Sequence, residues 1–364
     1  MPDEIGVIEP QHTKKWPVWV AVLIVIILAG GWYARGLAVP YFIEKARIAL
    51  NDEDAVVATK NLNIVLKLDS RNPVAYAYLG HITLGLDNAN PESDTPFPSA
   101  DFVKAIEYYE KALSLGLATA KNRGVYKQSL EFAGYSYWSQ KEYDKAVGKY
   151  LEQIEQFPDD SFWARYLTAS DYFNRSNKPV EALEILTMAP NSLDASKRVF
   201  GDVYTLLTRL SSYFGNSLDV KQYATLAIDN AVDKKSTNVQ IAYLNIAIQL
   251  AKEKNLAKAL GEYKKAEAIH KDSSVCTLSN IYFFNSDYIK AIEIAKGKIA
   301  STTIFDYPSS TCIEVLARSY LAKNNKIESK KYLEQYMNVT NAFKDKNVYV
   351  MRNREAFQKI LDDI

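Results

Sequence analysis

A recurrent spacing of small and aromatic residues limits most strongly what this chain can fold into. Within residues 127–160, Gly134 and Ala146 are small, and each is followed by an aromatic residue, Tyr137 three positions later and Tyr150 four positions later. Small residues at these points let two short helices pack closely against each other, while the aromatic rings fill the space alongside. One such hairpin leaves an apolar side bare, so we expect the chain to stack several of them.

The same pattern returns along most of the chain. Clear units begin at Pro73, Gln240, Asp272 and Ser310, and weaker ones cover residues 39–72, 163–192 and about 196–235. Together they predict about eight helical hairpins between residues 39 and 340. We expect the last helix, residues 353–363, to cover the apolar side of the final hairpin and to turn its acidic residues to water.

This 34-residue spacing resembles the tetratricopeptide repeat. The family has a large apolar residue at position 4, Leu at 7, Gly or Ala at 8, Tyr at 11, Ala at 20, an aromatic residue at 24, Ala at 27 and Pro at 32. The unit that begins at Lys127 supplies Leu130, Ala133, Gly134, Tyr137, Ala146, Tyr150, Gln153 and Pro158, of which Ala133 and Gln153 depart from the pattern. The resemblance implies an all-α, right-handed superhelical solenoid.

An apolar run precedes the repeats. Residues 16–34 contain no charge, and as a helix they would span ~28 Å, close to the hydrocarbon core of a bilayer. Trp16 and Trp32 stand near its two ends, as interfacial aromatic residues do. The sequence therefore predicts a tail (1–15), a transmembrane helix (16–34), a repeat array (35–340) and a capping region (341–364).

The flanking charges favour one orientation in the membrane. Lys14 and Lys15 precede the run and Arg35 follows it, which predicts a single-pass protein with a cytoplasmic N-terminus and an extracytoplasmic array. A cleaved signal peptide, with Val18–Ala29 as its apolar core, is the alternative. An inverted topology with a cytoplasmic array also stays open.

One hairpin carries an insertion. About thirteen residues interrupt the 34-residue period within the stretch of roughly residues 85–101, which contains three Pro and several acidic residues. A long loop in a compact array is a candidate contact element, and a tolerated surface insertion is the alternative.

No catalytic pattern occurs in the sequence. Motifs of the GxSxG, HExxH, Walker and GxGxxG types are absent, and three scattered His match no metal-ligand spacing. We therefore expect no enzymatic activity, no cofactor and no metal. The net charge of +1 gives no general attraction to nucleic acid.

The two cysteines fall on the first helices of adjacent repeats. Cys276 and Cys312 are expected to be packed or half-buried thiols, because corresponding helices in adjacent repeats stand ~8–10 Å apart. Pairing in an oxidising compartment stays open.

The resemblance also implies a binding surface. In tetratricopeptide arrays, positions 2, 5, 9, 12 and 13 of each first helix line a concave groove that binds proteins or peptides. In this sequence, those positions give His81, Glu131, Tyr135, Trp138, Asp171, Asn174, Arg175, Asn280, Phe283, Phe284, Glu314 and Arg318. For Trp138 and the two Phe, packing between repeats is the alternative. The residues with which some members clamp a terminal carboxylate are missing.

Three functions follow from these observations. The first is a membrane-anchored scaffold that binds partner proteins through its groove, by analogy in a secretion, pilus or envelope-assembly complex. The second is a self-associating spacer, supported by the weak small-residue pair Gly30 and Ala34. The third is a cytoplasm-facing adaptor, if the topology is inverted.

Overall fold

The fold is built from helices throughout the residues that the computed structural model describes, 18–85, 100–187, 197–270, 275–301, 307–343 and 348–364. The chain forms two compact units, Met1–Glu142 and Tyr143–Ile364. Their boundary falls inside the repeat predicted at residues 127–160, so each unit is described by itself.

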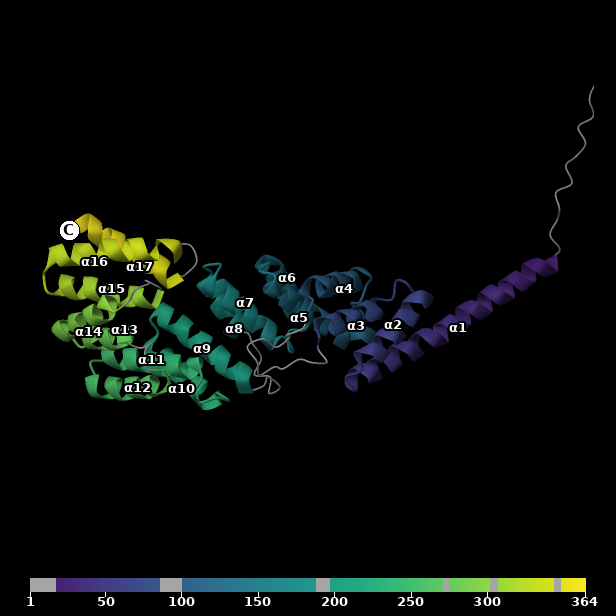
Figure 1. Ribbon diagram of the computed structural model, residues 1–364, viewed down its shortest axis with the longest axis horizontal. Helices are drawn as coiled ribbons and strands as arrows, with labels where there is room; N and C mark the ends of the chain where they lie inside the picture. The colour runs from purple at the N-terminus through teal and green to yellow at the C-terminus, as the bar shows by residue number, and fades with distance from the viewer. Residues whose placement is uncertain (1–17, 86–99, 188–196, 271–274, 302–306, 344–347) are drawn as a thin grey trace, which may run out of the picture. The chain divides into compact units, whose positions relative to one another are not determined.

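The first unit contains five α-helices and one short 3₁₀ helix in its described residues. These are α1 (Val18–Asn51), α2 (Ala55–Leu68), α3 (Pro73–Leu84), α4 (Phe102–Ser114), η2 (Ala120–Asn122) and α5 (Arg123–Ser139). Helices α1 and α2 pack as one pair, and α3 and α4 as the next (Figure 1).

The second unit contains the remaining helices. They are α6 (Tyr143–Gln156), α7 (Phe162–Asn174), α8 (Pro179–Thr187), α9 (Lys197–Phe214), α10 (Ser217–Asn230), α11 (Thr237–Lys252), α12 (Leu256–Ile269), α13 (Val275–Phe284), α14 (Tyr288–Ala300), α15 (Tyr307–Ala322), α16 (Lys326–Val339), η3 (Thr340–Phe343) and α17 (Val348–Asp363). From α7 to α16 consecutive helices pack as five pairs, which agrees with the predicted hairpins (Figure 1).

The small residue at position 8 has the role that its spacing predicts. Gly80 of α3 faces the ring of Tyr109 in α4, and a Cβ atom added at Gly80 would lie 2.7 Å from Cε1 of that ring. Tyr109 is fully buried, beside Leu84 and Ala105. The aromatic residue at position 24 therefore occupies the space that the missing side chain leaves.

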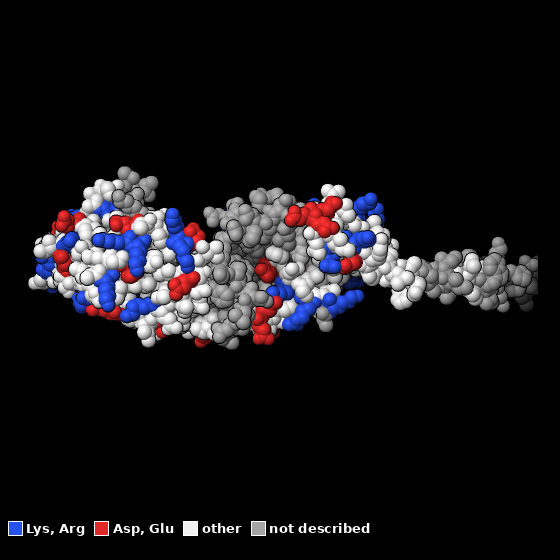
Figure 2. Space-filling view, turned by 90° about the horizontal axis from the view of Figure 1, so that it is seen from below, with Lys and Arg blue, Asp and Glu red and all other residues white. Residues whose placement is uncertain are grey.

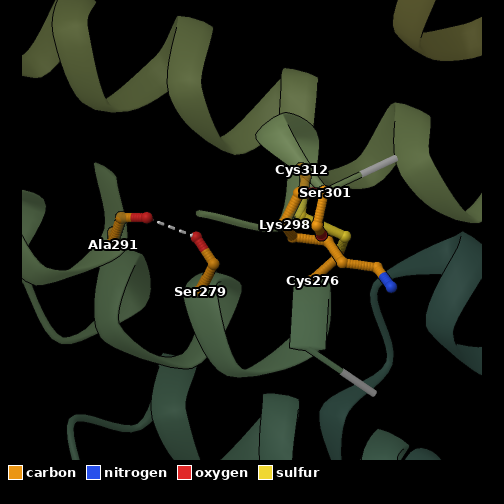
Figure 3. The surroundings of a disulfide bond; sticks show 6 residues. All are labelled: Cys276, Ser279, Ala291, Lys298, Ser301 and Cys312. Atoms are coloured by element: carbon orange, nitrogen blue, oxygen red, sulfur yellow. Dashed lines mark hydrogen bonds between the residues drawn. A yellow bond between two sulfur atoms is a disulfide. The ribbon is translucent and has the colours of Figure 1, made fainter. Parts of the chain in front are cut away.

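The close approach at positions 8 and 20 is also marked by hydrogen bonds. In the pair α13 and α14, Ser279 Oγ donates to the backbone carbonyl of Ala291 at 2.6 Å (Figure 3). In the pair α15 and α16 the two roles are exchanged, because Ser329 Oγ donates to the carbonyl of Ala317 at 2.9 Å. A hydroxyl can reach the backbone of the opposite helix only where both residues are small.

Several turns within the pairs share one design. A residue with positive φ follows two positions after the first helix, and the next residue caps the second helix with its side-chain oxygen. These two-residue steps are Glu53–Asp54, Lys254–Asn255, Ser286–Asp287 and Asn324–Asn325. In each of these turns three residues separate the two helices, and the second helix runs back along the first.

The structure contradicts the predicted membrane protein. Residues 16 and 17 lie outside the described part, and the rest of the predicted span is not a helix of its own. It is the first part of α1, which continues through Arg35 and the charged segment Glu44–Arg47 to Asn51. Within the described residues no helix is both long enough and apolar enough to cross a bilayer. The predicted single-pass membrane location is therefore wrong.

Helix α1 also joins two segments that the sequence analysis had separated. The first repeat was expected to begin at residue 39, and the structure continues one helix from Val18 to the end of that repeat's first helix. Arg35 donates to Asp69 at 2.9 Å and so ties this helix to the end of α2. Most of the predicted insertion, residues 86–99, lies outside the described residues.

Candidate functional site

A polar cavity of about 670 Å³ lies within the second unit. Its walls come from the odd-numbered helices α7, α9, α11, α13, α15 and α17, which are the first helices of successive pairs and the final helix. The lining residues are Tyr166, Ser170, Asp202, Thr205, Leu206, Arg209, Ser212, Asn238, Ile241, Asn245, Ile248, Lys252, Asn280, Phe284, Glu314, Arg318, Tyr349, Arg352 and Asn353. This is the inner side of the repeats that the sequence predicted as a groove.

Helix α17 closes this cavity by joining the last pair to a much earlier one. Tyr349 donates its hydroxyl proton to the backbone carbonyl of Arg209 at 2.6 Å. Arg352 donates to the carbonyl of Tyr213 at 2.6 Å, and its guanidinium lies 4.7 Å from the centre of that ring. On the other side, Asn353 donates to Glu314 of α15 at 2.9 Å.

The other half of α17 explains why the helix lies there. Phe357 is buried against Tyr336 of α16, with ring centres 4.9 Å apart. Arg354 donates to the carbonyl of Met337 at 2.5 Å and to Thr340 Oγ1 at 2.9 Å. This half of α17 therefore packs on the last helix pair, and the preceding turn of the same helix lines the cavity.

The carboxylates of the cavity are held by neighbouring donors. Glu314 receives the Asn353 amide and pairs with Arg318 at 3.0 Å. Burial raises the pKa of the Glu314 carboxyl, and the charges of Arg318 and Arg352 act in the opposite direction. Asp202 accepts a hydrogen bond from Asn238.

Tyr166 brings a phenol to the α7 side of the cavity. Burial raises its pKa to about 12, and the carboxylate of Asp202 acts in the same direction, while Arg209 opposes them. The phenol is therefore neutral at physiological pH, and it offers a hydroxyl rather than a charge.

A disulfide ties two walls of the cavity together. Cys276 of α13 and Cys312 of α15 are bonded, with 4.9 Å between their Cα atoms (Figure 3). The expectation of separate thiols was wrong because the distance between helix axes was taken as the distance between residues. Facing Cα atoms each lie about 2.3 Å from their own axis, and so they approach much more closely than the axes do.

Three residues of the predicted groove, and Glu314 with them, line this cavity. Asn280 and Phe284 come from α13, and Arg318 comes from α15. Phe283 lies beside Phe284 but contacts Tyr288 of the following helix, with ring centres 5.7 Å apart. This contact lies within one helix pair, and the place of Phe283 in a binding groove stays a prediction.

The predicted groove residues of α7 form a network next to the cavity. Asp171 is buried and accepts from Ser176 at 2.8 Å, and Arg175 lies 3.1 Å from it, over the ring of Tyr143. Asn174 accepts from Arg209 at 2.7 Å. The contact of Asn174 helps to position Arg209. Asp171, Asn174 and Arg175, which directly follows α7, are not among the lining residues.

The four predicted groove residues of the first unit lie in a different setting. His81 is 6% exposed, between the rings of Tyr78, Tyr109 and Phe132. Burial lowers its pKa to about 4, so the imidazole is neutral at physiological pH.

The other three residues of this group lie on α5. Tyr135 lies against Phe102, with ring centres 6.0 Å apart, and burial raises its pKa. Glu131 and Trp138 are half-buried. Their role as a binding surface stays a prediction.

Residues from α9 and α17 complete the cavity, and the sequence analysis did not find them. Arg209 lies in the weakest repeat, about 196–235, whose first helix lacks the usual position markers. Tyr349 and Arg352 precede the predicted final helix. The aromatic and basic residues just before the predicted final helix could have indicated a functional surface. They lie outside the repeats, however, so the repeat pattern assigns them no place in the groove.

The comparisons with known proteins give structural likeness only. No family model matches the chain, and no curated protein matches it. A tetratricopeptide repeat protein from Parabacteroides merdae is 15% identical and matches over 90% of this chain and 98% of its own, with a TM-score of 0.35.

Two further solved structures give similar values. The C-terminal part of a TPR repeat-containing protein from Cytophaga hutchinsonii is 11% identical over 85% of this chain and 98% of its own (TM-score 0.44). The apo form of the quorum sensor NprR from B. thuringiensis is 12% identical over 82% and 86% (TM-score 0.47). The repeat assignment therefore rests on the residue spacing and the helix contacts of this chain.

The residues that line the cavity supply hydrogen-bond donors, hydrogen-bond acceptors and charged groups. The described residues contain no group of three or more His, Cys, Asp or Glu side chains that could hold a metal ion. Figure 2 shows basic and acidic side chains interspersed on the face in view, without one continuous basic area of the kind that binds nucleic acid.

Proposed function

We propose that this protein is a binding module that holds a segment of a partner protein in the cavity of its second unit. The observation that carries the proposal is the hollow on the inner side of the repeats, where six helices converge and α17 reaches across to α9. Protein-binding repeats use such inner surfaces because each repeat adds side chains at regular intervals along a bound chain.

The lining favours a peptide over a small apolar ligand. Small-molecule pockets are lined mainly by apolar side chains, whereas this cavity presents several amides and hydroxyls. Asn245 and Asn280 carry both a donor and an acceptor, which are the groups that a peptide backbone requires in return. Phe284 adds an aromatic surface that can bury an apolar side chain with little loss of rotamer freedom.

The proposal leaves the predicted secretion, pilus or envelope setting behind, because that setting depended on the membrane span. It keeps the predicted protein or peptide partner and places it at Asn280, Phe284 and Arg318, which are members of the predicted groove that meet in one cavity.

The test is selection of displayed random linear peptides on the purified full-length chain. We expect enriched peptides to bind the unaltered protein and to lose most of their affinity for the variant Asn280→Ala/Phe284→Ala. The matched control is Lys264→Ala on the exposed side of α12, which should bind as the unaltered protein does. Circular dichroism and thermal unfolding would establish that all variants fold.

Two results would overturn the proposal. Enrichment of no peptide on a folded protein would exclude linear segments as ligands. Equal binding of the enriched peptides to the cavity variant and to Lys264→Ala would place the binding surface elsewhere. Light scattering of the same samples would show whether the chain self-associates instead, as the spacer hypothesis predicts.

A further inference from the structure

The cavity has an excess of positive charge. Its lining contains four basic residues, Arg209, Lys252, Arg318 and Arg352, and two acidic residues, Asp202 and Glu314. Since the whole chain carries a formal net charge of only +1, this local excess is a property of the site rather than of the composition.

Three of the four cations have partners that hold them in place. Arg209 donates to Asn174 at 2.7 Å, and Arg318 pairs with Glu314 at 3.0 Å. Arg352 donates to the carbonyl of Tyr213 at 2.6 Å and lies over its ring. These partners are mostly neutral, so they orient the guanidinium groups without cancelling the charge.

Lys252 is different. It ends α11, and its ammonium lies 5.5 Å from the centre of the Phe284 ring. Within the described part of the chain, no carboxylate lies within ion-pair distance of it. Although the residue as a whole is exposed, desolvation of its ammonium lowers its pKa, and the charges of Arg352 and Arg318 lower it further.

We infer that the cavity takes an acidic segment, with a carboxylate of the ligand placed between Lys252, Arg318 and Arg352. This inference rests on the proposed function and names the chemistry of its partner. A carboxylate at this point relieves the repulsion among three cations that come from three different helices, α11, α15 and α17.

The three cations are expected to contribute to carboxylate binding in different ways. The two guanidinium groups are already oriented, and each can offer a remaining N–H fork to carboxylate oxygens. Lys252 is the mobile member, a point charge on a flexible stem beside an aromatic ring. The carboxylate can be an Asp or Glu side chain or the C-terminus of a chain. Amidation of the C-terminus removes the terminal carboxylate and leaves the side-chain carboxylates intact.

The experiment uses the full-length protein and pools of synthetic peptides of equal length. One pool carries Asp and Glu at three central positions, the second carries Asn and Gln there, and the third carries Lys. All other positions are random, and each pool is made with a free and with an amidated C-terminus. The fraction that the protein retains is measured by mass spectrometry at physiological salt.

We expect the acidic pool to be retained about tenfold better than the amide pool, and the basic pool least, as charge-assisted hydrogen bonds require. Lys252→Gln should reduce the advantage of the acidic pool, Lys252→Glu should abolish it, and Lys252→Arg should keep it. Lys264→Gln on the outer side of α12 is the matched loss of one charge and should change nothing.

The outcomes separate the two proposals. Equal retention of all pools, unchanged by amidation and by Lys252→Glu, would overturn the charge inference and leave peptide binding standing. Retention of no pool would contradict peptide binding itself. Retention of the free-terminus pools that amidation abolishes would assign the site to a chain terminus, and an acidic preference that persists after amidation would assign the site to acidic side chains; both results support a carboxylate.

Discussion

The same repeat position has opposite surroundings in the two units. Position 9 of a first helix is His81 in the first unit, where three aromatic rings bury it. In the second unit the same position is Asn280 or Arg318, and both line a cavity whose walls carry many polar side chains. The repeat pattern fixes the helix pairs, but it does not decide whether their inner side is packed or open.

The residue at position 6 of the following repeat explains part of this difference. In the first unit it is Phe132, whose ring lies 5.5 Å from the His81 ring. The corresponding residue that follows Asn280 is Val315, which packs instead with Tyr282 and Ala291. A smaller side chain at this position leaves position 9 uncovered. Three experiments can sharpen or break the comparison.

The largest expected effect comes from the disulfide, which only the second unit carries among the described residues. The cross-link closes a loop with a sequence separation of 36, for which chain entropy gives about 4 kcal/mol of stabilisation. We expect Cys276→Ala/Cys312→Ala to lower the stability of the second unit by about that amount and to weaken peptide binding, because α13 and α15 carry the cavity walls. Hydrogen exchange followed by mass spectrometry would measure this.

The first unit serves as the internal control for this experiment. Its amides should exchange as in the unaltered protein, and addition of a reductant should reproduce the effect of the double variant. An equal loss of protection in both units would contradict the description of two compact units.

The next effect is a pH dependence that belongs to the first unit. His81 has a folded pKa of about 4 and an unfolded pKa near 6.5, so the unfolded chain binds the proton first as pH falls. The stability is complete above pH 6.5 and decreases as pH falls toward 4, by up to about 3 kcal/mol. Urea unfolding at several pH values, together with hydrogen exchange in α3 and α4, would measure how the free energy of unfolding changes with pH.

Two variants separate His81 from the carboxyl groups that titrate in the same range. His81→Phe should remove this part of the slope and keep the fold, since the site is surrounded by rings. Phe132→Val should uncover the imidazole and move its pKa toward the ordinary value. An unchanged slope in His81→Phe would show that the imidazole does not cause it.

The smallest effect compares two glycines. Gly80→Ala should destabilise the first unit by about 1–2 kcal/mol, because the added methyl group meets the buried ring of Tyr109. Gly261→Ala in α12 meets no atom within 4 Å and should stabilise the second unit by about 0.5–1 kcal/mol through helix propensity. Thermal unfolding of both variants would show the opposite signs, and equal signs would refute the close packing at position 8.

The residue spacing predicted those features of the fold that depend on local contacts. The helix pairs and the small residue opposite an aromatic ring at Gly80 and Tyr109 agree with the spacing, and the last helix packs against Tyr336. Each depends on residues within one repeat or on the next element, and so one 34-residue window contains all the information.

The features that the sequence did not predict depend on contacts between distant residues or on where a helix begins and ends. The apolar run at residues 16–34 predicted a separate span, whereas its residues 18–34 belong to a longer helix that continues into charged residues. Prediction of the disulfide would have required the distance between facing Cα atoms of two helices in adjacent repeats. The cavity required α17 to reach α9, and no periodicity reports a contact between such distant residues.

The hydrogen bond between Tyr349 and Arg209 joins residues 140 positions apart, and this separation changes how the second unit must unfold. In an open repeat array each repeat depends only on the two beside it, so the ends can fray and repeats can be deleted one at a time. Here the last helix holds an early repeat, and fraying at the C-terminus removes support from α9 as well. The second unit is therefore expected to lose its helices cooperatively, and to fold more slowly than a repeat array of the same length that is not closed.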